Sequence, residues 1–167
     1  MGKHCCQDME REAEQVCEQH PNRFDCPDCL IDHSAHLREY GLIIHDGYRP
    51  WYVTKIFWEA TPVDKRIFVA NPATGSNHNR GCAVDLSLYD LKTGEEVTMP
   101  SGYDEMSQRA YADFPGGTAD ERARRALLRR VMEKQGFTVN PEEWWHFDYK
   151  DWKKYAIQNV RFEDIGR

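Results

Sequence analysis

Hydrophobic residues recur at two different periods along this chain, and each period predicts its own kind of element. From Cys82 to Tyr89 apolar residues occupy every second position, which predicts a strand with Asp85 on the face opposite the apolar row. A capping box beginning at Thr118 predicts the start of the strongest helix, and Gly136 predicts its end. The buried stripe expected for that helix comprises Ala123, Leu127, Leu128, Val131 and Met132.

Shorter apolar runs and turn-forming residues predict the remaining elements. Residues 71–80 and 99–117 are rich in residues that favour turns, and the second stretch has the length of a functional loop. The other expected elements are helices over 8–19 and 30–40, a strand over 42–44, a helix through Val53 and Phe57 that ends before Pro62, a strand closing at 69–70 and a strand over 137–139.

The composition excludes several classes of protein. Acidic and basic residues are mixed along the sequence and the net charge is −6, so we expect no nucleic-acid partner, which would require a basic stripe. The longest aliphatic run is Leu42-Ile43-Ile44, whereas a membrane-spanning helix needs about 20 apolar residues. The first residues are polar and unlike an export signal, so we expect a cytoplasmic protein. The 167 residues suit one compact domain with a small appendage, and the oligomeric state stays open.

Five of the six cysteines lie in the first 29 residues. Without an export signal these thiols are expected to be reduced, which favours metal binding over disulfides. Four ligand-type residues fall within a short stretch and have the spacing of a small structural zinc site: Cys17, His20, Cys26 and Cys29. The alternative is a cysteine-rich segment that binds no metal.

Two distant segments together offer the ligands of a catalytic zinc site. The stretch SNHNRGCAVD supplies His78 and Asp85, and His146 supplies a third ligand, which leaves one coordination position open for water. Glu143 would act as the general base. A regular strand sends residues 143 and 146 to opposite faces, so this segment is expected to contain a turn or bulge.

Each of these residues also has an ordinary structural interpretation. A histidine or aspartate near a turn is most often a cap or a solvated side chain. The pair Trp144-Trp145 is more often core packing than substrate contact, and Glu143 alone could be a surface acid. Their joint occurrence favours the metal site.

The chain resembles a known family at these same motifs. SNHNRGCAVD fits the pattern SxHxxGxAxD, and the segment Glu143-Trp144-Trp145-His146 fits ExxH. With these motifs the chain resembles the zinc D-alanyl-D-alanine dipeptidases of the vancomycin-resistance type. That family lies within the D-Ala-D-Ala metallopeptidases, which are related to the hedgehog zinc domain. The resemblance continues through DGYRPW at residues 46–51, and it covers residues 30–163.

The resemblance implies an α+β fold, with a small antiparallel sheet flanked by helices and the zinc site at the sheet. It implies hydrolysis of D-alanyl-D-alanine or a related short D-amino-acid dipeptide, in cell-wall precursor turnover or glycopeptide resistance. His78, Asp85 and His146 would bind the catalytic Zn²⁺, Glu143 would be the base, and Arg49 of the YRP motif would stabilise the oxyanion.

Further residues of these motifs are candidates for the substrate pocket. Tyr48 and Trp145 are expected to contact substrate, and Ser76 either orders the ligand loop or touches substrate. Cys82 is expected in the core, and Gly81 is expected to be small so that the backbone can pass close to the metal.

The front of the chain departs from the family pattern. Residues 1–29 resemble a small cysteine-rich bacterial domain, so the chain is divided into two parts. The first is a cysteine-rich segment over 1–29, which is either a zinc knuckle or a fusion remnant, and the second is a dipeptidase-like domain over 30–167. Two alternatives to the dipeptidase stay open, namely a non-catalytic zinc-binding module and a D,D- or L,D-carboxypeptidase acting on peptidoglycan stem peptides.

Overall fold

The computed structural model describes residues 39–165. The helix expected over 8–19 lies outside the described residues, as does most of the helix expected over 30–40. Tyr40, the expected last residue of that second helix, instead begins a strand.

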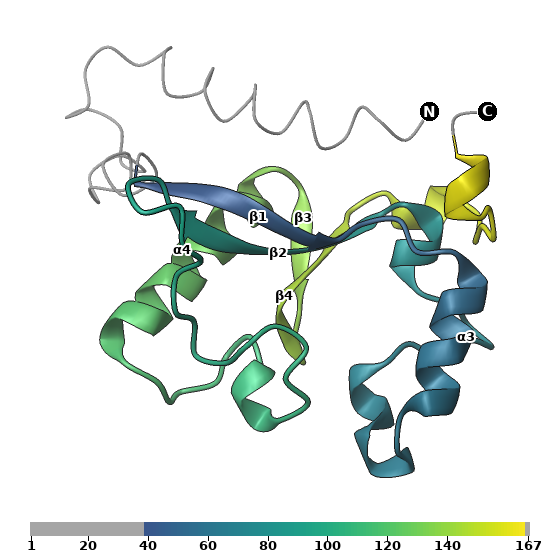
Figure 1. Ribbon diagram of the computed structural model, residues 1–167, viewed down its shortest axis with the longest axis horizontal. Helices are drawn as coiled ribbons and strands as arrows, with labels where there is room; N and C mark the ends of the chain where they lie inside the picture. The colour runs from purple at the N-terminus through teal and green to yellow at the C-terminus, as the bar shows by residue number, and fades with distance from the viewer. Residues whose placement is uncertain (1–38, 166–167) are drawn as a thin grey trace. The chain divides into compact units, whose positions relative to one another are not determined.

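The described residues contain two α-helices and four strands, shown in Figure 1. They are β1 (Tyr40–Asp46), α3 (Trp51–Ala60), β2 (Ala83–Asp90), α4 (Ala119–Lys134), β3 (Phe137–Asn140) and β4 (Glu143–Tyr149). Short 3₁₀ turns occupy Val63–Phe68, Asn77–Arg80, Gln108–Ala110, Trp152–Lys154 and Phe162–Asp164. Neither described α-helix has the length and apolar character needed to cross a membrane.

The four strands form one sheet in the order β1-β2-β4-β3. Strand β4 pairs antiparallel with β2 on one side and with β3 on the other. Phe147 of β4 has Val84 and Val139 as its two cross-strand partners, so these three side chains share one apolar face. The predicted α+β fold with a small antiparallel sheet is therefore confirmed.

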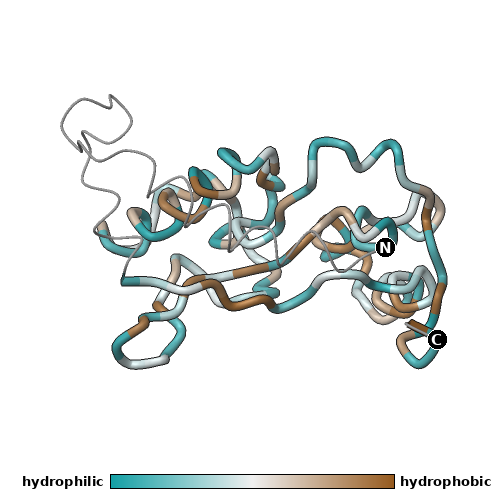
Figure 2. Tube along the Cα trace, turned by 90° about the horizontal axis from the view of Figure 1, so that it is seen from above, coloured by the Kyte–Doolittle hydropathy of each residue, from teal (hydrophilic) through white to brown (hydrophobic). Residues whose placement is uncertain are grey.

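The core lies around the central strands and the second half of α4. Helix α4 packs against β3 and β4, and Leu128 and Met132 of the helix and Phe147 of β4 are fully buried. Figure 2 shows hydrophobic residues along the strands and mostly hydrophilic ones in the connecting loops. Strand β2 is buried on both faces from Ala83 to Leu88, so Asp85 is 3% exposed even though it lies opposite the apolar row.

Two details of the predicted elements are wrong. Val69 has extended dihedral angles but follows the 3₁₀ turn Val63–Phe68, and no strand forms at 69–70 because the N–H of Val69 bonds back to the Arg66 carbonyl. In the predicted stripe of α4, Leu127, Leu128 and Met132 are buried, but Ala123 is exposed and Val131 is only half-buried.

The described residues divide between two compact units. Residues 42–88 and 96–165 form one unit, which carries the cluster of His78, Asp85 and His146 and its neighbours described below. The turn Tyr89–Glu95 belongs to the other unit together with Glu39–Gly41. Within it the Leu91 N–H bonds to the Glu39 carbonyl (2.8 Å).

The capping box of α4 is present as predicted. Thr118 Oγ1 accepts a hydrogen bond from the Glu121 N–H (3.2 Å), and Glu121 Oε2 accepts one from the Thr118 N–H (2.7 Å). We expect Thr118→Ala to lower the free energy of unfolding by about 1 kcal/mol, because one N–H at the helix start loses its acceptor. Urea denaturation measures the change, with Thr118→Ser as the matched control. Equal losses in both variants would contradict the capping role.

Candidate metal centre

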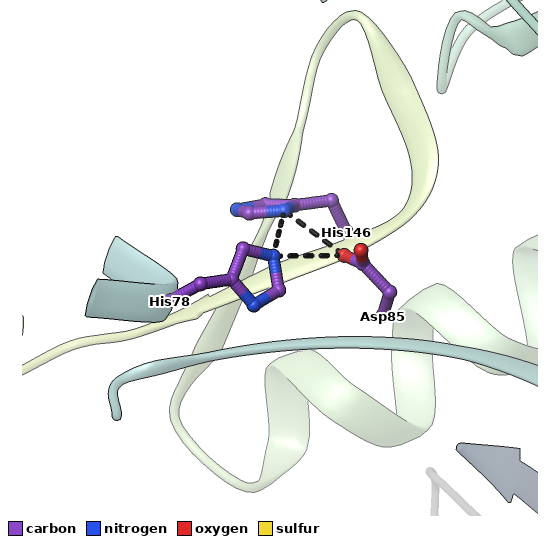
Figure 3. A group of neighbouring side chains, drawn as sticks. All are labelled: His78, Asp85 and His146. Atoms are coloured by element: carbon purple, nitrogen blue, oxygen red, sulfur yellow. Dashed lines mark hydrogen bonds and ion pairs between the residues drawn. The ribbon is translucent and has the colours of Figure 1, made fainter. Parts of the chain in front are cut away.

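The three predicted metal ligands converge on one point. His78 comes from the turn Asn77–Arg80, Asp85 from β2 and His146 from β4, where it is the direct cross-strand partner of Asp85 (Figure 3). His78 Nε2 lies 3.2 Å from Asp85 Oδ1, His146 Nδ1 lies 3.0 Å from the same oxygen, and the two nitrogens are 3.1 Å apart. Ligand atoms around a tetrahedral zinc ion stand about 3.3 Å apart. Within residues 39–165 this is the one cluster of His, Cys, Asp and Glu with the spacing of a metal site.

The turn that carries His78 is fixed by its own side chains. Ser76 Oγ accepts a hydrogen bond from the His78 N–H (3.2 Å), and Asn79 Oδ1 accepts one from the Ser76 N–H (2.8 Å). Gly81 ends the turn with a φ of 65°, in the left-handed region that favours glycine. No atom beyond its chain neighbours lies within 4 Å of where a Cβ would stand on Gly81. Its backbone conformation, and not close packing near the metal, explains this glycine.

Hydrogen bonds join this turn to the YRP segment. The Arg49 N–H donates to the His78 carbonyl (3.1 Å), and Asn79 Nδ2 donates to the Arg49 carbonyl (2.8 Å) and to Thr54 Oγ1 (2.9 Å). Asn79 is fully buried, so water does not compete for these bonds. The two motifs, about 30 residues apart in sequence, therefore form one hydrogen-bonded unit.

Each histidine uses its other ring nitrogen on a fixed acceptor. His78 Nδ1–H donates to the Gly47 carbonyl (2.7 Å), and His146 Nε2–H donates to Asp148 Oδ1 (3.0 Å). These bonds fix the tautomers, because the N–H then lies on the far side of each ring. The lone pairs of His78 Nε2 and His146 Nδ1 are left facing the centre of the cluster.

The electrostatics of the cluster favour a positive charge at its centre. Burial alone would raise the pKa of Asp85, but the neighbouring imidazoles hold it well below its usual range. Burial alone would lower the pKa of His146, but Asp148 and Asp85 raise it to about 10. When both histidines are neutral, as metal ligands are, their N–H groups are directed elsewhere and buried Asp85 Oδ1 has no hydrogen-bond donor. A cation bound by two imidazole nitrogens and this oxygen satisfies all three acceptors, so the residues fit a metal ion.

The predicted irregularity in β4 is present and brings Glu143 to the cluster. The pairing of β3 with β4 shifts register, because Val139 faces Phe147 whereas the next residue, Asn140, faces Glu143. Glu143 Oε2 thereby lies 3.8 Å from His146 Nδ1 and accepts a hydrogen bond from Asn140 Nδ2 (2.9 Å). Burial raises the pKa of Glu143 to about 7. Its carboxyl group therefore changes protonation state near neutral pH.

Arg49 also lies beside the cluster. Its guanidinium donates through Nε (2.8 Å) and Nη2 to Asp46 Oδ2, packs over the ring of Phe57, and reaches within 3.9 Å of Asp85 Oδ2. The Arg49 side chain is 15% exposed. A partly buried cation held next to a metal ligand is suited to bind developing negative charge.

The three candidates for substrate contact take part in packing or capping. Ser76 caps the turn of His78 and is 8% exposed. The Tyr48 hydroxyl donates to the Val160 carbonyl (2.9 Å). Trp145 is 2% exposed and makes edge contacts with the rings of Trp144 and Tyr103, which leaves little of its surface for a substrate.

The cysteines have different outcomes. Cys82 is buried, as predicted for a core residue. The proposed second metal site of Cys17, His20, Cys26 and Cys29 lies outside the described residues.

Three residues of the site were missed in the sequence. Asp148 follows His146 by two positions, and this strand periodicity could have identified it as a residue on the same face. Asp46 lies two residues before the YRP segment, but nothing in the sequence indicates that its carboxylate accepts hydrogen bonds from Arg49. The Tyr103 hydroxyl donates to Asp85 Oδ2 (3.2 Å), and burial raises the pKa of Tyr103, so the hydroxyl stays protonated. Nothing in the sequence around residue 103 indicates that contact.

Comparisons with known proteins agree with the geometry. A family model described as D-ala-D-ala dipeptidase matches residues 30–165. The chain is similar to the D-alanyl-D-alanine dipeptidases of Escherichia coli (36% identity over 77% of this chain), Enterococcus faecium (37% over 70%) and Enterococcus faecalis (39% over 71%). It spans 65–66% of the length of these relatives, just under two thirds.

Proposed function

Because the chain belongs to the D-Ala-D-Ala dipeptidase family, we propose that it is a zinc-dependent peptidase that hydrolyses D-alanyl-D-alanine or a related short D-amino-acid dipeptide. The observation that carries the proposal is the convergence of His78, Asp85 and His146, with Glu143 and Arg49 beside them. A metal site that only stabilises a fold requires neither a carboxylic acid with a pKa near neutrality nor a guanidinium at its edge.

The metal would be held by His78 Nε2, Asp85 Oδ1 and His146 Nδ1. Zn²⁺ suits this set because imidazole nitrogen and carboxylate oxygen are among its usual ligands, and three protein ligands are typical of catalytic sites. When bound, the ion supplies a Lewis acid that polarises a peptide carbonyl and lowers the pKa of a water molecule to about 7.

Glu143 would move the proton that hydrolysis requires. Its carboxylate takes a proton from the attacking water and returns it to the leaving amine nitrogen as the peptide C–N bond breaks. A pKa of about 7 suits both steps, because the group can accept and release a proton near neutral pH. Asn140 holds Oε2, while Oε1 accepts no hydrogen bond from residues 39–165 and is available to the water.

Arg49 would act on the substrate oxygen. Water attack converts the carbonyl oxygen into an oxyanion, and a fixed guanidinium stabilises that charge more in the transition state than in the ground state. Asp46 engages Nε and Nη2, so Nη1 is the donor without a partner among the described residues. The Asp46 contact thus orients the guanidinium and leaves one group free for substrate.

Hydrolysis of D-alanyl-D-alanine would serve cell-wall precursor turnover or glycopeptide resistance. The assignment of Ser76, Tyr48 and Trp145 to the substrate pocket remains part of this proposal, and for Ser76 the hydrogen bond from the His78 N–H supports the alternative that it orders the ligand loop. Cys17, His20, Cys26 and Cys29 remain the proposed ligands of a second, structural zinc ion.

Metal removal and restoration test the function. We expect the purified chain to release D-alanine from D-alanyl-D-alanine. Dialysis against a chelator should lower the rate of release by a factor on the order of 100 or more, and addition of Zn²⁺ should restore it. L-alanyl-L-alanine is the control substrate, and a peptidoglycan stem pentapeptide separates dipeptidase from carboxypeptidase activity.

Zinc content measured on the same samples completes the test. One equivalent of zinc is expected from the cluster, and a further equivalent that is lost in Cys26→Ser would come from the N-terminal cysteines. A chain that binds zinc stoichiometrically yet cleaves none of these peptides would instead be a non-catalytic zinc-binding module.

A further inference from the structure

The second carboxylate oxygen of Asp85 has its own hydrogen-bond donor. Oδ1 faces His78 and His146, whereas Oδ2 accepts a hydrogen bond from the Tyr103 hydroxyl at 3.2 Å and lies 3.9 Å from Arg49 Nη2. A carboxylate whose second oxygen is engaged in this way is restrained from rotating about its Cβ–Cγ bond. It presents one oxygen to a metal ion and keeps the other away from it.

The ring of Tyr103 is held from two sides. It stacks on His45, with ring centroids 4.3 Å apart and planes inclined by 13°, and it meets Trp145 edge to face at 5.6 Å. His45 is itself held by a hydrogen bond, since its Nε2 lies 3.3 Å from Glu96 Oε1. These contacts leave the hydroxyl little freedom to move away from Asp85.

The loop that carries Tyr103 is also anchored. At its start, Ser101 Oγ accepts a hydrogen bond from Trp144 Nε1 (2.8 Å), and both residues are buried. Glu105 closes the loop, because its carboxylate accepts hydrogen bonds from the Gly102 N–H (3.2 Å) and from Ser107 Oγ (2.6 Å). Asp104 adopts a φ of 57°, a left-handed conformation that aspartate tolerates better than most residues. The loop position is therefore specified independently of Asp85.

We propose that Tyr103 is a positioning residue of the metal site, whose hydroxyl holds the Asp85 carboxylate so that Oδ1 alone meets the ion. The inference rests on the proposed function, because it takes the cluster of His78, Asp85 and His146 to bind zinc. Tyr103 acts through Asp85 and not on the substrate. Outer hydrogen bonds of this kind typically contribute about 10- to 100-fold to metal affinity.

Zinc affinity of Tyr103→Phe tests the proposal without reference to turnover. Competition of the full-length chain with a chromophoric chelator gives the dissociation constant for Zn²⁺, and we expect the variant to bind roughly 10-fold more weakly. The aromatic ring and its contacts with His45 and Trp145 remain, so the circular dichroism spectrum of the metal-free variant should match that of the wild type, while its melting temperature falls because Asp85 Oδ2 loses a donor. Tyr149→Phe is the matched control, because its ring packs on Phe137 and its hydroxyl makes no hydrogen bond with the described residues.

The spectrum of the Co²⁺-substituted protein gives a second readout. Without the Tyr103 hydroxyl, Asp85 is free to bind through both oxygens, which raises the coordination number and weakens the visible d–d bands. If the wild type binds metal and Tyr103→Phe shows the same zinc affinity and the same cobalt spectrum, the role of Tyr103 is overturned and the proposed function is not. A wild type that binds no zinc would overturn the proposed function and this inference with it.

Discussion

Glu143→Gln is expected to lower kcat by about 10²- to 10⁴-fold while the chain keeps its metal. Glutamine preserves the size of the side chain and can still accept a hydrogen bond from Asn140, but it cannot take a proton from water. Glu143 Oε2 lies 3.8 Å from His146 Nδ1 and is not one of the three converging ligand atoms, so zinc affinity should change little. Steady-state rates of D-alanine release and zinc titration measure the two effects separately.

Glu142→Gln is the control for this experiment. It makes the same chemical change at the neighbouring residue, whose side chain makes no hydrogen bond or ion pair with residues 39–165. A similar loss of rate in both variants, or loss of zinc from Glu143→Gln, would remove Glu143 from the role of base.

Arg49→Ala should lower kcat by about 10²- to 10³-fold and change KM much less. The guanidinium lies beside the cluster, 3.9 Å from Asp85 Oδ2, and in the proposed mechanism it faces the oxygen of the scissile carbonyl, which becomes negative. Because that charge develops mainly in the transition state, the lost interaction appears in kcat and not in substrate binding. Arg49→Lys should restore only part of the rate, since an ammonium group cannot contact Asp46 through two nitrogens and still face the substrate.

Arg66→Ala provides the comparison for Arg49. Each guanidinium packs over an aromatic ring of α3, Arg49 over Phe57 at 4.8 Å and Arg66 over Trp58 at 4.7 Å, but Arg66 makes no contact with the cluster. If the two variants lose activity equally, Arg49 acts through packing and the oxyanion role is contradicted.

The sequence predicted the parts of the structure that depend on local chemistry. The alternation of Cys82–Tyr89 became β2, the capping box at Thr118 begins α4, and the ExxH spacing required the register shift that the β3–β4 pairing contains. Each follows from residue order alone, because strand period, helix capping and side-chain direction are local properties.

Other features depend on partners that residue order does not reveal. Val69 has the extended backbone of a strand, but none of the strands within residues 39–165 pairs with it. The Tyr103–Asp85 contact joins a loop to β2 through a conformation set by Ser101 and Glu105, and no pattern of spacing encodes it. The carbonyl of Gly47 that fixes the tautomer of His78 belongs to the backbone, so residue type gives no sign of it.

Because of the register shift in β4, the positions of His146 and Glu143 depend on different neighbouring strands. His146 is held by its pairing with β2, whereas Glu143 is held by β3 through Asn140. Substitutions at Asn140 are therefore expected to change the acidity and position of the proposed base while the strand pair that carries Asp85 and His146 stays unchanged. If the proposed function holds, Asn140 variants are expected to differ in catalytic rate and pH optimum while keeping the same affinity for metal.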